Sequence, residues 1–197
     1  MNILKKNHNI LLRLVTLSLL AAISIVLVSI IRIPMFTTYL EYEPADVPIL
    51  IGGLMFGPAA GLLLTVVVSF IQALIFSSGS GFIGFIMHVI ATGAMVVLAS
   101  LIYRKGKKAI ENDYLRLIVA LIVGMLTMTT VMVLMNLLLT PIYTGMSARD
   151  IWNQMMFTVI VPFNLVKSGI NSAAAFVIYP ILARFLKSSG KYENICA

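Results

Sequence analysis

No charged residue occurs between Val47 and Tyr103, in the stretch VPILIGGLMFGPAAGLLLTVVVSFIQALIFSSGSGFIGFIMHVIATGAMVVLASLIY. An ordinary soluble domain carries about 25% charged residues, so a run of this length without one cannot cover a surface that faces water. The run is also much longer than the roughly 20 apolar residues with which a helix crosses the hydrocarbon core of a bilayer. It therefore predicts several membrane-spanning helices in succession.

The whole chain shares the character of this stretch. Its 197 residues are 60% hydrophobic and 11% charged, and the mean hydropathy is +1.05. These values exclude a soluble enzyme, a nucleic-acid-binding domain and a disordered regulator, despite a formal net charge of +7. The single cysteine, Cys196, has no partner for an internal disulfide or a metal site. The composition predicts an all-α, polytopic protein of the lipid bilayer that binds neither nucleic acid nor metal.

Two breaks divide the charge-free stretch. They are the pair Gly57-Pro58 and the cluster SSGSG at 77–81, and both are typical of turns between elements. The piece before Gly57 is too short to span a bilayer, since it extends only about 15 Å as a helix. It is either a separate partial helix or the first part of one helix that runs from 47 to 76 with a kink at Pro58.

Basic residues decide between these alternatives. The run RKGKK at 104–108 and the N-terminal Lys5 and Lys6 are expected on the cytoplasmic side. An even number of crossings then separates them, which favours two helices with a break.

The first apolar run, at 14–31, is longer than the roughly 7–15 residues of a signal-peptide core. We therefore expect a helix that is retained in the mature protein.

The prediction is a single domain, 1–197, with both termini in the cytoplasm. Its six transmembrane helices are expected at about 11–32, 46–56, 59–76, 82–103, 115–140 and 154–186. The loops at 36–46, near 79 and at 141–153 then face outward.

One ionisable residue interrupts the last apolar segment, in the sequence VPFNLVKSGIN at 161–171. Lys167 lies on one helix face with Asn164 and Asn171, because the three are spaced i, i+3 and i+7. Pro162 can bend that face toward a cavity. Such a group inside a membrane indicates a functional site by default. The alternative is a lysine that snorkels to an interface, but its distance from both ends of the segment favours a buried polar site.

Other polar residues in the apolar segments have less specific interpretations. Asn136 alone more often joins two helices than contacts a ligand. His88 has no second ligand at metal spacing and is expected to be a satisfied packing residue. Ser69 and Gln72 either face the same cavity as Lys167 or bond a neighbour.

Two further features concern surfaces. The loop FTTYLEYEP at 36–44 is either an interfacial aromatic belt or a lid over a planar ligand, and the residues leave both open. Ser18 and Ala22 form a small-xxx-small pair that lets another membrane helix approach closely.

Motifs that are absent from the sequence exclude several classes of protein. The sequence contains no G-x-x-x-x-G-K-[ST] motif for ATP binding. All seven acidic residues are expected in loops or at helix ends, away from the membrane interior. An intramembrane enzyme or a proton-coupled carrier would need such groups inside. The protein is therefore not expected to be an enzyme, and a partner must supply any energy for transport.

Three motifs resemble the substrate-binding S component of energy-coupling-factor (ECF) vitamin transporters, and most of all its riboflavin-specific members. They are LEYEPADVP at 40–48, FGPAAG at 56–61 and VPFNLVK at 161–167, of which the last is the most specific. The resemblance implies a substrate-capturing subunit of an ATP-driven importer in the membrane of a prokaryotic cell. Riboflavin or a related flavin would be the transported ligand, and no cofactor is expected.

The resemblance also implies roles for individual residues. Asn164, Lys167 and Asn136 would hold the ribityl hydroxyls, and Asn171 joins this candidate set because it shares their helix face. The first loop would cover the flavin ring with its residues Tyr39, Leu40 and Glu41. The remaining pair, Ser18 and Ala22, would pack on the transmembrane coupling subunit of an ECF module that also contains two ATPases.

The chain departs from the riboflavin-specific pattern in two helices. It has VSFIQ at 68–72 where such members commonly carry a lysine–asparagine pair, and GFIMH at 84–88 where they tend to carry Glu and Asn. An S component for another vitamin, such as pantothenate, folate or thiamine, is therefore one alternative. A stand-alone secondary transporter is a second, and a membrane enzyme that acts on lipids or isoprenoids is the weakest.

Overall fold

The computed structural model describes residues 2–37, 40–75 and 81–188. Within these ranges, the helical elements are α1 (Asn2–Ile30), α2 (Asp46–Phe56), α3 (Pro58–Ile75), α4 (Gly81–Lys105), the 3-10 turn η1 (Gly106–Lys108), α5 (Asp113–Thr144), α6 (Ala148–Asp150), the π-helix η2 (Ile151–Ile160) and α7 (Val161–Ser188). The last three form one continuous helical stretch. A two-stranded antiparallel hairpin, β1 (Ile33–Pro34) with β2 (Glu41–Tyr42), connects α1 to α2.

Among the described residues, five helical stretches are long and apolar enough to cross a membrane, and α2 is a shorter apolar helix. The predicted all-α membrane fold is confirmed. The structure places the first two helices of the charge-free stretch at 46–56 and 58–75, beside expected bounds of 46–56 and 59–76. The first and last helices begin earlier than expected, at Asn2 and Ala148.

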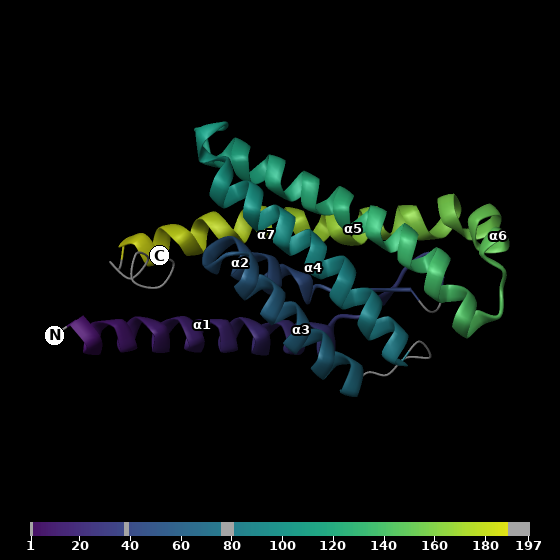
Figure 1. Cartoon of the computed structure of the whole chain (residues 1–197), viewed down its shortest axis with the longest axis horizontal. Coiled ribbons are helices and arrows are strands. Elements are labelled where there is room, and N and C mark those ends of the chain that lie inside the picture. Colours follow the sequence, from purple (N-terminus) through teal and green to yellow (C-terminus); the bar gives the residue numbers. More distant parts are fainter. Residues whose placement is uncertain (1, 38–39, 76–80, 189–197) are drawn as a thin grey trace.

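The overall arrangement is a bundle with α2 inside it (Figure 1). This short helix packs against α1, α3, α4 and α7, and all of its residues are buried. Helix α1 lies along one edge, and the start of α1 and the end of α7 lie at the same end of the molecule. The cytoplasmic location of that end, and the single-domain organisation, stay predictions.

A glycine separates α2 from α3. Gly57 has φ +95°, a conformation that residues with a side chain rarely adopt, and its N–H donates to the carbonyl of Gly53 at 2.8 Å. Pro58 then occupies the first position of α3, where its missing N–H has no consequence. The chain therefore forms two helices, as the charge parity predicted, and not one kinked helix.

Two arginines from other helices complete the end of α2. Arg13 of α1 donates to the carbonyl of Phe56 at 2.9 Å, and Arg104 of α4 donates to that of Met55 at 2.8 Å. The last carbonyls of a helix have no partner within it. These arginines satisfy two of them, which lowers the cost of ending α2 inside the bundle.

The length of α2 determines how deep the first loop reaches. Eleven residues rise about 16 Å as a helix, which is about half of a hydrocarbon core about 30 Å thick. Asp46, the first residue of α2, is 1% exposed, and Ser24 of α1 donates to the carbonyl of the preceding Ala45 at 2.9 Å. The segment between α1 and α2 therefore descends into the bundle and ends beside its core.

Glycines allow α2 and α3 to pack closely. A Cβ atom on Gly61 would lie 2.8 Å from the Cα of Gly53 and 2.3 Å from a methyl of Val96 on α4. Both separations are shorter than van der Waals contact allows for a Cβ atom. A side chain at this position therefore pushes α2, α3 and α4 apart.

This packing predicts the effect of a substitution. Gly61→Val is expected to lower the free energy of unfolding by about 1–3 kcal/mol, because the overpacked side chain must displace two helices. The melting temperature of the detergent-purified protein measures the effect. Leu63→Val is the matched control, since Leu63 lies on the outward face of the same helix and is 56% exposed. Equal melting temperatures for the two variants would contradict the packing.

Candidate functional site

The polar face expected on the last helix is buried in the structure. Asn164, Lys167 and Asn171 all point into the bundle, where α7 packs against α2 and α5. Ser168 and Ser172 continue the same buried face. The side chain of Lys167 is 9% exposed, so its ammonium group does not snorkel to the surface.

The helix changes its winding just before this face. Residues 151–160 form the π-helix η2, and the regular α-helical pattern begins at Val161. Pro162 has no N–H to donate, and its ring crowds the carbonyl of the preceding turn, which disfavours a regular α-helix there. The amide nitrogen of Asn164 donates to the carbonyl of Ile160 at 2.8 Å, at the junction itself. Segments of π-helix are frequent at functional sites.

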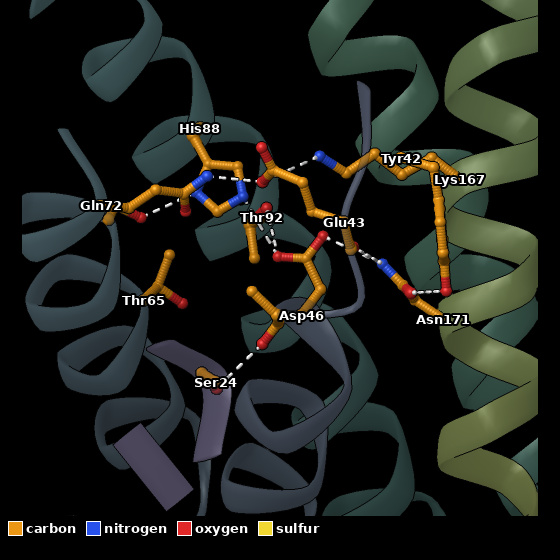
Figure 2. A network of polar contacts seen from close by, with 12 residues as sticks. Ser24, Tyr42, Glu43, Asp46, Thr65, Gln72, His88, Thr92, Lys167 and Asn171 are labelled. Carbon is orange, nitrogen blue, oxygen red and sulfur yellow. Dashed lines mark hydrogen bonds and ion pairs between the residues drawn. The ribbon is translucent and has the colours of Figure 1, made fainter. Parts of the chain in front are cut away.

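The first loop meets this face with an acid and a tyrosine. The Nζ of Lys167 lies 3.9 Å from Oε2 of Glu43. Asn171 donates to the carbonyl oxygen of Glu43 at 3.2 Å and to Oδ2 of Asp46 at 3.3 Å. Tyr42 donates its hydroxyl to Oδ1 of Asn171 at 3.1 Å (Figure 2). The loop is therefore attached to α7 through both its side chains and its backbone.

The carboxylates of Glu43 and Asp46 also contact α3 and α4, which lie across the bundle from α7. Thr92 of α4 donates to Oδ1 of Asp46 at 3.3 Å, and Nε2 of His88 lies 3.2 Å from that oxygen. The other ring nitrogen of His88, Nδ1, is 2.7 Å from the hydroxyl oxygen of Ser69 on α3. Gln72, also on α3, donates to Oε2 of Glu43 at 2.5 Å (Figure 2). Glu43 and Asp46 thus bridge α3, α4 and α7.

These contacts show a feature of the acidic residues that the sequence did not predict. Glu43 lies in a loop and Asp46 at a helix end, as expected, but both are buried within the protein, at 7% and 1% exposed. The contact between Asp46 and His88 is an acid–histidine pair that the sequence interpretation did not foresee. The physical reason is the shortness of α2, which brings the end of the loop inside the bundle.

The charge of Asp46 also acts on the loop. Burial, and after it the negative charge of Asp46, raise the pKa of the Tyr42 phenol above its ordinary value. The phenol therefore stays protonated at neutral pH. This matches its role as the donor to Asn171.

The outer part of the loop carries its own ion pairs. Arg32, just after α1, lies 2.8 Å from Oε2 of Glu41 and 3.7 Å from Oε1 of Glu43. The carbonyl of Leu40 accepts the N–H of Met35 at 2.8 Å, which closes the hairpin. Tyr39, the third residue expected over a flavin ring, lies outside the described residues.

Asn136 is buried on α5, and its hydrogen bonds stay within that helix. Its amide nitrogen donates to the carbonyl of Met132 at 2.8 Å, and its oxygen accepts the hydroxyl of Thr140 at 2.9 Å. A contact of Asn136 with a ligand stays a prediction.

Several buried polar atoms around the network have no hydrogen-bond partner among the residues that the structure describes. They include Oδ1 of Asn164, Oγ of Ser172 and Oε1 of Gln72. Most buried polar groups in proteins are hydrogen-bonded, so such atoms need an explanation. Lys167 adds donors, because 3.9 Å to Glu43 is an ion pair but too long for a hydrogen bond. Acceptors and donors of this kind suit a ligand with several hydroxyl groups.

Two further expectations concern metals and partners. Within the part of the chain that the structure describes, no group of three or more His, Cys, Asp or Glu residues is placed to hold a metal ion. Ser18 and Ala22 are both exposed on α1, whereas Leu17, Leu20 and Ser24 of the same helix are buried. The small pair therefore faces out of the bundle.

Comparisons with known proteins agree on one family. The sequence model described as "ECF transporter, substrate-specific component" matches residues 12–183. The riboflavin transporter RibU of Staphylococcus aureus is 35% identical over 181 residues, which cover 89% of this chain and 92% of that protein. The riboflavin transporter FmnP of Bacillus subtilis is 27% identical, over 85% of this chain and 90% of its own.

A solved structure has the same fold. It is the S component of a bacterial ECF transporter, and it is similar with a TM-score of 0.71 at 33% sequence identity. The similarity covers 89% of this chain and 97% of that one.

The network around Asp46 predicts a loss of stability. Asp46→Ala removes the acceptor of Thr92 and Asn171 and the partner of His88, so buried polar groups lose their counterparts. The expected cost is about 3 kcal/mol or more in the free energy of unfolding, visible as a lower melting temperature. Glu111→Ala, at an exposed acid between α4 and α5, is the control. A melting temperature for Asp46→Ala equal to that of the control would contradict the network.

Proposed function

Because the chain belongs to the substrate-specific components of ECF transporters, we propose that it captures riboflavin, or a closely related flavin, from outside the cell for ATP-driven import. As a member of this family it is a multi-pass membrane protein and a transporter component, not an enzyme. The observation that carries the ligand proposal is the buried face of α7. There the oxygen of Asn164 has no partner within the described part of the chain, and the ammonium of Lys167 retains its donors.

The chemistry of riboflavin suits this face. Its ribityl chain carries several hydroxyls, each of which both donates and accepts a hydrogen bond. The oxygen of Asn164 accepts such a bond, and the ammonium of Lys167 donates. The planar ring requires an apolar cover, a role that we assign to Leu40 of the loop. The relatives that match along most of this chain are named riboflavin transporters, which supports the same ligand.

The departures from the riboflavin-specific pattern have a structural explanation. Gln72 donates a hydrogen bond to Glu43. Ser69 contacts one ring nitrogen of His88, whose other ring nitrogen lies beside Asp46. These side chains therefore act on the loop that closes the site. We infer that they position this loop and do not require a different vitamin.

The partners follow from the family and from the surface of α1. An ECF substrate-specific component works with a module that couples it to ATP, and this chain has no nucleotide-binding motif of its own. We propose that the exposed Ser18 and Ala22 pack on the transmembrane coupling subunit, which two ATPases drive. Of the five candidate spans found in the described residues, that of α1 is the least buried, which leaves room for such a contact.

Riboflavin binding tests the proposal directly. The purified protein is expected to quench the fluorescence of added riboflavin. Lys167→Ala and Asn164→Ala are each expected to weaken binding by about 10- to 100-fold, because each removes a buried hydrogen-bonding group. Lys107→Ala, which removes an exposed ammonium outside the site, is the control.

Two results would contradict the proposal. One is a protein that binds no flavin while pantothenate, folate or thiamine raises its melting temperature. The other is transport in proteoliposomes that an ion gradient drives without ATPases, which would indicate a secondary transporter.

A further inference from the structure

Glu43 occupies an unusual place for a loop carboxylate. Its Oε2 accepts a hydrogen bond from Gln72 of α3 and lies 3.9 Å from the ammonium of Lys167 on α7. Its Oε1 lies 3.7 Å from Arg32, and its backbone carbonyl accepts from Asn171. Three contacts to the carboxylate and one to the backbone therefore hold Glu43 beside Lys167.

Lys167 needs a counter-ion in this place. An ammonium group that leaves water for an apolar interior loses its hydration, and a nearby carboxylate offsets part of that cost. Glu43 supplies the negative charge at ion-pair distance. It does so without a hydrogen bond, so the donors of Lys167 stay available to a ligand.

The other charged groups near Lys167 have partners of their own. Asp46 lies beside His88 and accepts hydrogen bonds from Thr92 and Asn171. Arg32 pairs with Glu41 at 2.8 Å. With Glu43 ionised, Lys167 therefore presents donors to the site with its positive charge already balanced.

We propose that Glu43 sets the charge preference of the substrate site, by balancing Lys167 so that the site favours an uncharged polyhydroxyl ligand over the same ligand with a phosphate group. This inference rests on the proposed function, and it adds a residue that determines specificity. A phosphate near Lys167 would meet the carboxylate of Glu43 in a place of low dielectric constant, where like charges repel strongly. Without the charge of Glu43, Lys167 loses its ion-pair partner and attracts the phosphate more strongly.

The test compares two ligands on one set of variants. Dissociation constants for riboflavin and for riboflavin 5′-phosphate are measured with the full-length wild type and with Glu43→Gln, which keeps the size of the side chain. The ratio of the phosphate constant to the riboflavin constant is expected to fall by about tenfold or more in Glu43→Gln. Glu111→Gln, at an exposed acid far along the chain from the site, is expected to leave the ratio within about twofold.

Two more variants separate charge from structure. Glu43→Asp keeps the charge, and its ratio is expected to match the wild type even where both affinities fall. Lys167→Gln removes the cation that attracts a phosphate, so its ratio is expected to rise, opposite to Glu43→Gln. Because Lys167→Gln removes the ammonium group and leaves Glu43 in place, it tests the inference even where Glu43→Gln does not fold.

The outcomes distinguish this inference from the proposed function. A wild type that binds riboflavin, with the same ratio in Glu43→Gln and Lys167→Gln, would overturn the charge role and leave the proposed function standing. Parallel losses of both ligands in Glu43→Gln would also overturn it, since they indicate a purely structural role. A wild type that binds neither flavin would overturn both.

Discussion

A charge inside a membrane protein requires compensation, and the burial of Lys167 on α7 is the constraint on which the arrangement of this molecule depends. Within the described ranges, its ion-pair partner does not come from another membrane-spanning helix. It comes from Glu43, on the segment that connects α1 to α2. The loop must therefore descend into the bundle, and it stays there because α3, α4 and α7 all bond its two carboxylates.

The short helix α2 makes this descent possible. Its residues are all buried, it ends at a glycine in a left-handed conformation, and Arg13 and Arg104 satisfy its last carbonyls. Close contact between Gly53 and Gly61 holds α3 against it. Local sequence features thus fix the depth of Asp46, and the depth of Asp46 brings Glu43 to Lys167.

The sequence predicted the helices well, since hydropathy, breaks and basic residues are local signals that a bilayer imposes. The break at Gly57 and the buried face with Asn164, Lys167 and Asn171 belong to this class. The positions of Glu43 and Asp46 do not, because a polar loop looks the same in sequence whether it faces water or enters a bundle. The hydrogen bonds of Ser69, Gln72 and His88 depend on how deep the loop lies. Local sequence patterns therefore could not predict their partners.

The central claim is that the buried polar face of α7, balanced by the loop, holds a flavin. Mass spectrometry of the small molecules released from protein purified from riboflavin-containing cells tests this claim most directly. The account predicts riboflavin in an amount close to that of the protein. Release of a different vitamin, in a comparable amount and without flavin, would contradict it.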